Sequence, residues 1–138
     1  MPYQVPRDAD EVLAFLAKGN PKIIAGCTDF FPGLKQGESR DDIVDITHVA
    51  GARGVSKTEN GWRIGAATTW TDIVTAPLPP AFDGLKQAAR EIGSLQIQNR
   101  ATVVGNICNA SPAADGVPPL LTLNATVEVA STSGNRIV

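Results

Sequence analysis

The chain has 138 residues, of which 43% are hydrophobic and 19% charged, so it can bury a core as one domain or as two small subdomains. Its 12 basic and 14 acidic residues give a net charge of -2, which argues against nucleic acid as the main partner because phosphate binding requires clustered positive charge. No apolar run approaches the roughly 20 residues that span a bilayer, and the N-terminus lacks the basic and then apolar order of a secretory signal, so we expect a cytoplasmic protein without membrane contact.

The first 52 residues predict a compact α/β unit. Asp8 and Glu11 resemble a capping box, and apolar residues at helical spacing follow, so a helix is expected over residues 9–18. Short apolar runs predict a buried strand at residues 23–25 and a second strand at residues 43–46. A short helical stretch is expected between them, at residues 30–37.

Residues 53–93 predict a β-hairpin followed by two helices. Asn60-Gly61 separates two strand-like runs, and this dipeptide is typical of a two-residue hairpin turn in which both residues have positive φ. Thr69 and Asp72 form a second capping-box pattern, which opens a short helix. The next helix is expected to bury one face, which carries Phe82, Leu85, Ala89 and Ile92.

The segment 94–119 is rich in Gly, Asn, Ser and Pro, yet it carries several apolar side chains. We therefore expect an ordered loop, and ordered long loops are often functional. A buried segment is expected from residue 120 and a strand over residues 127–130. Gly134-Asn135 predicts a turn into another strand, which reaches only its third residue at Val138, so we expect this strand to continue in a longer chain.

Two glycine-containing segments have a character that suits phosphate binding. Residues 25–29 and 101–106 each carry an apolar run into a glycine beside small polar residues, where the backbone can approach a ligand closely. We expect Gly26 and Gly105 to face one another across a cleft and to cradle a diphosphate through N–H groups directed into it. The commoner alternative is two ordinary glycine turns, and neither segment matches the G-x-G-x-x-G or P-loop pattern.

Asp115 follows a run of hydrogen-bonding residues and could accept hydrogen bonds from ribose hydroxyls. We expect it near the same cleft, without a Lys or Arg partner. The alternative is a helix cap or an Asx turn, because Asp-Gly is a common turn dipeptide.

No pattern indicates a catalytic or metal site. The single histidine, His48, has no nucleophile or acid pattern nearby and is expected in a surface loop. The two cysteines, Cys27 and Cys108, have neither the number nor the spacing of a disulfide framework, a zinc site or an iron–sulfur cluster. Cys27 is interpreted as a small packed or semi-exposed thiol, with a low-pKa thiolate at a helix N-terminus as the alternative.

Three segments together resemble the FAD-binding subunit or domain of the molybdenum hydroxylases, the family of xanthine dehydrogenase and aerobic carbon monoxide dehydrogenase. Residues 23–29 (IIAGCTD) resemble A-G-G-T-D, residues 101–107 (ATVVGNI) resemble A-T-I-G-G-N-I, and residues 109–116 (NASPAADG) resemble N-A-S-P-x-x-D. Their order and separation are specific, and the resemblance extends over nearly the whole chain. Cys27 and Val104 stand where the pattern has glycine.

The resemblance implies an α+β (α/β) fold with two subdomains, residues 1–52 and 53–138, similar to the PCMH-type, vanillyl-alcohol-oxidase-like flavoproteins and followed by a C-terminal domain. FAD would lie between the subdomains, with its diphosphate between the two glycine segments. Asp29 would organise the first of these turns. The implied FAD-binding residues are Ile23, Ile24, Ala25, Gly26, Cys27, Thr28, Asp29, Ile92, Thr102, Gly105, Asn106 and Asp115.

The resemblance also implies an FAD-dependent, xanthine dehydrogenase-like oxidoreductase subunit that is not active alone. It would pass electrons from 2Fe-2S centres to FAD and on to NAD+ or another acceptor. Its partners would be a molybdopterin-binding subunit and a 2Fe-2S subunit. The alternatives are a flavin-free scaffold that binds such subunits and a different flavoenzyme, such as a nucleotide-sugar reductase. We expect residues 1–138 alone to bind FAD weakly or not at all.

Overall fold

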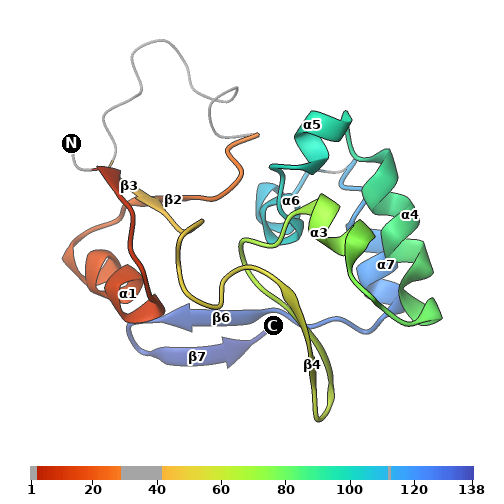
Figure 1. Cartoon of the computed structure of the whole chain (residues 1–138). Coiled ribbons are helices and arrows are strands. Elements are labelled where there is room, and N and C mark those ends of the chain that lie inside the picture. The colour runs from red at the N-terminus through yellow and green to blue at the C-terminus, as the bar shows by residue number, and fades with distance from the viewer. Residues whose placement is uncertain (1–2, 29–41, 112) are drawn as a thin grey trace.

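The computed structural model describes residues 3–28, 42–111 and 113–138 (Figure 1). Asp29 and the helical stretch expected at residues 30–37 lie outside the described residues. In chain order, the elements are β1 (Tyr3–Gln4), α1 (Ala9–Lys18), β2 (Lys22–Ile24), β3 (Ile43–Asp45), β4 (Val55–Thr58), β5 (Gly61–Ile64), α3 (Trp70–Thr75), the 3-10 helix η1 (Pro80–Phe82), α4 (Asp83–Glu91), α5 (Leu95–Gln98), α6 (Val103–Asn109), α7 (Val117–Thr122), β6 (Glu128–Ser131) and β7 (Gly134–Ile137).

The N-terminal elements form a three-stranded parallel sheet in the order β1-β3-β2, with α1 beside it (Figure 1). The helix predicted over residues 9–18 is confirmed, and the Asp8 carboxylate accepts a 2.8 Å hydrogen bond from the Glu11 amide. Ile24 is buried in β2 as predicted, whereas Ile23 is half exposed because successive strand residues point to opposite faces of the sheet. The prediction that the whole run is buried is therefore wrong for Ile23.

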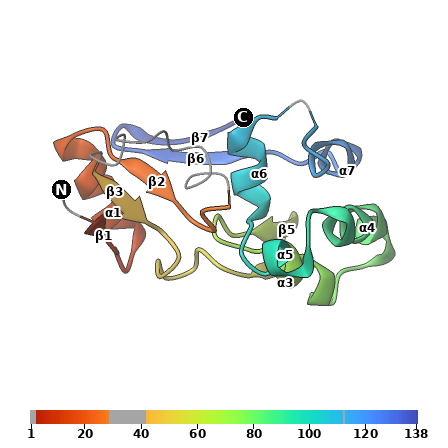
Figure 2. The ribbon, with the colours of Figure 1, turned by 90° about the horizontal axis from the view of Figure 1, so that it is seen from above.

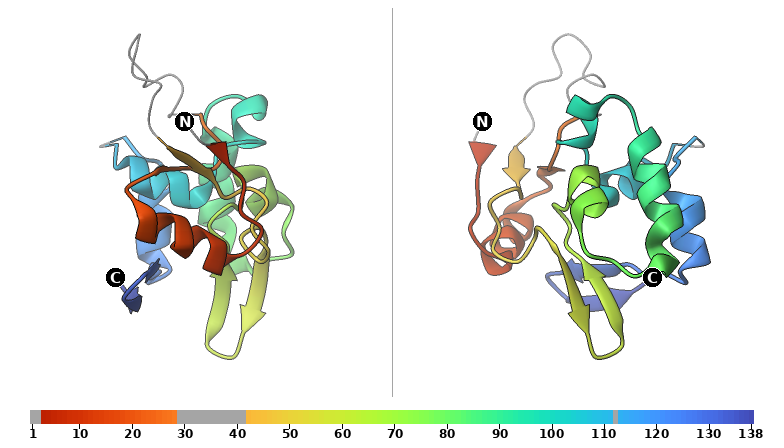
Figure 3. Two further views of the ribbon diagram at one scale, coloured as in Figure 1. Left: turned by 90° about the vertical axis from the view of Figure 1, so that its left-hand side faces the viewer. Right: turned by 45° about the vertical axis from the view of Figure 1, so that its right-hand side comes forward.

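The second group of elements packs around one apolar core. The core centres on Trp70, Ile73, Leu85 and Ala89, which come from α3 and α4 and are almost completely buried. The β4–β5 hairpin projects from this body (Figure 3), and Trp62 of β5 packs edge-on against Phe82 at a centroid distance of 6.0 Å. The core face predicted for α4 is thus confirmed at its centre, at Leu85 and Ala89.

Both hairpin turns precede their predicted positions, by one residue in the β4–β5 hairpin and by two residues in the β6–β7 hairpin. In the β4–β5 hairpin, Thr58 pairs with Gly61, so the turn residues are Glu59 and Asn60, and neither has positive φ. In the β6–β7 hairpin, Ser131 pairs with Gly134 in the same way. Gly61 (φ +148°) and Gly134 (φ +114°) use their conformational freedom as the first residue of the returning strand, so the predicted type I′ turn at Asn60-Gly61 is wrong.

The expectation of a long loop over residues 94–119 is also wrong, because the structure forms α5, α6 and the start of α7 there. Ser94 Oγ accepts a 3.2 Å hydrogen bond from the Ile97 amide, and Thr102 Oγ1 accepts a 2.9 Å hydrogen bond from the Gly105 amide. The sequence signal for these two helices is weak, because each has a single cap and lacks the Glu or Gln at the third helical position that completes a capping box.

Backbone pairing fixes α6 at the centre of the molecule. The Trp70 amide donates to the Ala101 carbonyl (3.1 Å), and the Val103 amide donates to the Thr68 carbonyl (3.0 Å). The start of α6 is therefore joined to the start of α3, and α6 lies between β2 and α7 (Figures 1 and 2). In Figure 1 the β6–β7 hairpin lies below α6 and reaches toward α1, and Arg63 of β5 pairs with Glu128 of β6.

No helix within the described residues is long and apolar enough to cross a membrane.

The capping box that opens α3 gives a prediction with a defined pH dependence. Thr69 Oγ1 accepts from the Asp72 amide, the Asp72 carboxylate accepts from the Thr69 amide, and Arg53 donates to the same carboxylate. The hydrogen bond from Arg53 is the main cause that holds the pKa of Asp72 below its ordinary value. Replacing Asp72→Asn should therefore lower the free energy of unfolding by about 1 kcal/mol at pH 7.

The sign of the pH effect follows from the lowered pKa. The stabilisation by Asp72 is complete above the unfolded pKa of about 4 and is lost as the pH falls through the lower folded value. Urea unfolding of wild type and Asp72→Asn should show two curves that converge in acid. Asp83→Asn, in the first turn of α4, is the matched control and should cost less. A stability difference that stays constant into acid would contradict this account.

Candidate functional site

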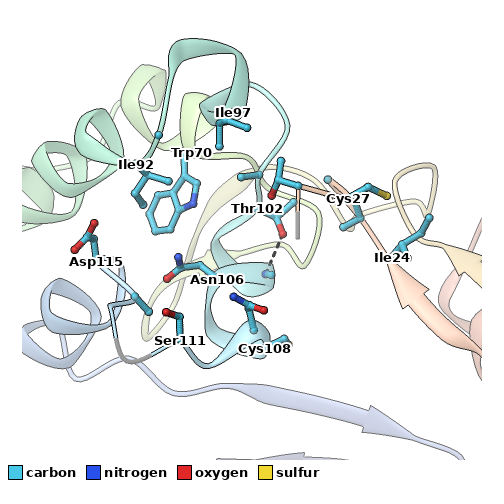
Figure 4. A pocket seen from close by; sticks show the side chains of 18 of the residues that line it. Ile24, Cys27, Trp70, Ile92, Ile97, Thr102, Asn106, Cys108, Ser111 and Asp115 are labelled. Atoms are coloured by element: carbon cyan, nitrogen blue, oxygen red, sulfur yellow. Dashed lines mark hydrogen bonds between the residues drawn. The ribbon is translucent and has the colours of Figure 1, made fainter. Parts of the chain in front are cut away.

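One pocket of about 580 Å³ lies between the N-terminal sheet and the helices (Figure 4). It is lined by the segment that follows β2, by the loop between α4 and α5, by Trp70 of α3, by the exposed side of α6 and by the chain before α7. Every residue implied to bind FAD that the structure describes lines this one pocket: Ile23, Ile24, Ala25, Gly26, Cys27, Thr28, Ile92, Thr102, Gly105, Asn106 and Asp115.

The first wall of the pocket is the turn after β2. Gly26 packs directly on the backbone of Arg100, and a Cβ at this position would lie 1.9 Å from the carbonyl oxygen of that residue. Cys27 follows with φ +61°, a left-handed conformation that costs an ordinary residue about 1–2 kcal/mol. The amides of Gly26 and Cys27 donate no hydrogen bond to another described residue. Two adjacent N–H groups beside a pocket can bind an anion.

The second wall is a helix and not the predicted glycine turn. Thr102 is the N-cap of α6, and its Oγ1 accepts the hydrogen bond from Gly105 N–H, so this N–H is not directed into the pocket as predicted. A Cβ at Gly105 would lie 2.6 Å from the same Oγ1. Val104 is helical and is not among the residues that line the pocket, so it needs no glycine-like conformation. The contribution of α6 to the pocket therefore comes mainly from side chains.

A buried donor and a buried acceptor at the pocket lack hydrogen-bond partners. Trp70 is fully buried, yet its indole Nε1 donates to no described residue, and the buried Oδ1 of Asn106 likewise has no partner there. Both side chains lie close to Gly116, where a Cβ would lie 2.6 Å from Trp70 Cη2 and 2.9 Å from Asn106 Oδ1. Figure 4 shows the two side chains in the same pocket. Buried polar groups are normally paired, so this arrangement indicates a bound ligand or water.

Trp70 has two properties: it is completely buried in the core, and it also lines the pocket. The sequence contains no signal for the second property, since an indole N–H is orphaned only by its surroundings. The Thr69 cap and the Ala101 carbonyl place the indole there by fixing the first turn of α3.

The charges around the pocket are few. Asp115 is exposed at the rim, has no Lys or Arg partner among the described residues and caps no helix, because α7 has no side-chain cap. No Lys, Arg or His lines the pocket among the residues that the structure describes. The pocket thus offers amides, hydroxyls and one carboxylate to a ligand, and dipoles rather than cationic side chains would stabilise a negatively charged group there.

The thiolate alternative for Cys27 is wrong. Burial is the main cause that raises the pKa of Cys27, the Asp45 carboxylate adds to it, and Sγ donates to the Ala25 carbonyl at 3.5 Å. This cysteine is therefore a protonated, partly buried thiol at neutral pH. His48 is exposed in a turn after β3, as predicted. Among the described residues, no three His, Cys, Asp or Glu side chains gather as metal ligands.

Comparison with known proteins identifies relatives over the full chain. The family model described as "FAD binding domain in molybdopterin dehydrogenase" matches residues 1–138. The chain is 38% identical to the putative xanthine dehydrogenase FAD-binding subunit of Escherichia coli K12, covering 94% of this chain and 46% of that protein. It is 37% identical to the glyceraldehyde dehydrogenase medium chain of Sulfolobus acidocaldarius, covering 99% of this chain and 50% of that protein.

Solved structures show the same fold. Carbon monoxide dehydrogenase from Hydrogenophaga pseudoflava matches with a TM-score of 0.87 at 27% identity, and quinoline 2-oxidoreductase from Pseudomonas putida 86 matches with a TM-score of 0.90 at 26% identity. Each match covers 100% of this chain and 50% of the other chain. The predicted α+β fold and the predicted family are thus confirmed, and the chain spans about half the length of these relatives. This chain belongs to the family of FAD-binding domains of molybdopterin dehydrogenases.

Proposed function

We propose that this chain is the FAD-binding part of an electron-transfer subunit of a molybdenum hydroxylase and that the pocket between β2 and α6 holds FAD. One observation supports this most strongly. Four polar groups at the pocket have no hydrogen-bond partner among the described residues: the amides of Gly26 and Cys27, the buried donor on Trp70 and the buried acceptor on Asn106. A ligand with both anionic and neutral polar groups would satisfy all four.

The lining residues fit FAD in size and chemistry. The pocket volume of about 580 Å³ lies within the range of cofactor sites. The amides of Gly26 and Cys27 would bind the diphosphate, because fixed N–H dipoles stabilise negative charge in a partly buried site. The Asp115 carboxylate would accept hydrogen bonds from ribose hydroxyls. Ile92 would present an apolar surface to the flavin ring.

These contacts give the cofactor and the protein different roles. When bound, FAD supplies the capacity to accept and pass on electrons, and the protein supplies position and electrostatics. The described residues contain no metal-ligand cluster, so we propose that electrons reach this subunit from 2Fe-2S centres on a partner subunit. A molybdopterin-binding subunit would oxidise the substrate, and NAD+ or another acceptor would receive the electrons. We also propose that the chain divides into two subdomains, residues 1–52 and residues 53–138.

The contact between Gly26 and Arg100 gives a direct test of the first wall. Gly26→Ala should displace the segment at residues 25–28, because the added Cβ would collide with the Arg100 carbonyl oxygen. We expect a large loss of bound flavin in the purified full-length subunit, measured by visible absorbance against protein concentration. Circular dichroism and the melting temperature should show that the variant still folds.

Gly84→Ala is the matched control for this substitution. Gly84 lies in α4, and a Cβ added there would have no neighbouring atom within 4 Å, so the same chemical change should leave flavin content unaltered. It should also raise stability by up to about 1 kcal/mol, because alanine favours helices over glycine. If folded Gly26→Ala retained the flavin content of Gly84→Ala, the first wall would not hold the cofactor.

A second prediction separates the electron-transfer subunit from the flavin-free scaffold. The full-length subunit, purified with the subunits that accompany it, should contain one FAD per copy, together with iron and molybdopterin on other chains. Cofactor extraction followed by chromatography and metal analysis measures this composition. A complex with iron and molybdopterin but no flavin would support the scaffold alternative instead.

A further inference from the structure

Both cysteines of the chain lie at the same pocket, although they come from different parts of the fold. Cys27 belongs to the segment after β2, and Cys108 belongs to α6 (Figure 4). The proposed function uses neither thiol group. Their surroundings differ, and this difference makes one of them accessible to reagents in solution.

Cys108 is the accessible thiol. Its side chain is exposed, and its Sγ takes part in no hydrogen bond with the described residues. Cys27 is partly buried, and its Sγ donates to the Ala25 carbonyl. Burial and the nearby Asp45 carboxylate raise the pKa of Cys27, which keeps it protonated. The thiolate is the nucleophile in disulfide exchange, so Cys27 should react slowly.

A second observation points to a ligand in the pocket that Cys108 lines. Trp70 is completely buried, and its unpartnered Nε1 lies at the pocket that Cys108 also lines. A group attached to Cys108 would therefore project from α6 at the pocket that is proposed to hold a ligand. This relation distinguishes Cys108 from an ordinary surface cysteine.

We propose that Cys108 is a thiol-modification site for small disulfides, and that its mixed disulfide and bound FAD exclude one another from the pocket. This inference rests on the proposed function, because it takes FAD as the competing ligand. In the reaction, the Cys108 thiolate attacks one sulfur of a peptide disulfide. A new S–S bond forms, the old S–S bond breaks, and the departing thiolate takes up a proton. The cysteine is oxidised, and half of the reagent is reduced to a thiol.

Glutathione disulfide is a suitable probe, and mass spectrometry of the full-length subunit measures the adduct at each cysteine. With FAD removed, Cys108 should react faster than Cys27. If only the empty pocket reacts, free FAD at about 100 times its Kd should slow the reaction roughly 100-fold. The modified protein should bind FAD much more weakly in a fluorescence titration, and reduction with dithiothreitol should restore binding.

Two variants serve as controls. Cys108→Ser should bind FAD equally well before and after treatment with glutathione disulfide. Ser56→Cys, made in the Cys108→Ser background, places a thiol on exposed strand β4 outside the pocket lining, and its modification rate should not respond to FAD. Together they separate occlusion of the pocket from a general effect of FAD or of the reagent.

The outcomes separate the two proposals. If the reduced, unmodified protein bound no FAD, the proposed function would fail and this inference with it. If FAD bound but did not slow modification of Cys108, or if the modified protein bound FAD with unchanged Kd, this inference alone would be overturned. Protection of Cys108 by FAD together with weakened FAD binding after its modification would establish it.

Discussion

The contact between Gly26 and the backbone of Arg100 determines how the two halves of the structure meet. The missing Cβ brings the end of β2 against the chain just before α6, closer than any other residue type allows. The pocket exists because of this approach, since one wall is the segment after β2 and the other is α6. Gly26 therefore allows two backbone segments to pack against each other. The amides of Gly26 and Cys27 in this turn donate no hydrogen bond to another described residue.

The second wall depends on the pairing between residues 68–70 and residues 101–103. That pairing joins the N-termini of α3 and α6 and places Trp70 and Asn106 on the same pocket. The amides of Val103, Gly105 and Asn106 at the start of α6 donate to protein acceptors, whereas two buried side-chain polar atoms have no partner among the described residues. This arrangement is the reverse of a phosphate loop, in which backbone amides bind the ligand. The two walls thus differ in the groups that they present, with backbone amides on one side and side chains on the other.

Local sequence signals predicted the elements that local interactions stabilise. The helix capped by Asp8 and the helix opened by the Thr69–Asp72 box both form as predicted, because each cap acts within one turn of chain. The segment 94–119 was predicted as a loop, since α5 and α6 are short and depend on single caps and on pairing with distant residues. The described residues that the family resemblance implies for FAD binding all line one pocket. The resemblance could not reveal the unpaired Nε1 of Trp70, because that state depends on the three-dimensional surroundings.

The central claim is that one ligand contacts both walls of the pocket at once. Hydrogen exchange followed by mass spectrometry, with and without FAD, tests this claim most directly. Because FAD would bind the free amides of Gly26 and Cys27 and the side chain of Asn106, peptides covering residues 23–28 and 102–109 should both exchange more slowly when it is present, while the β4–β5 hairpin should not change. Protection confined to one wall, or protection of the hairpin with neither wall affected, would contradict this account.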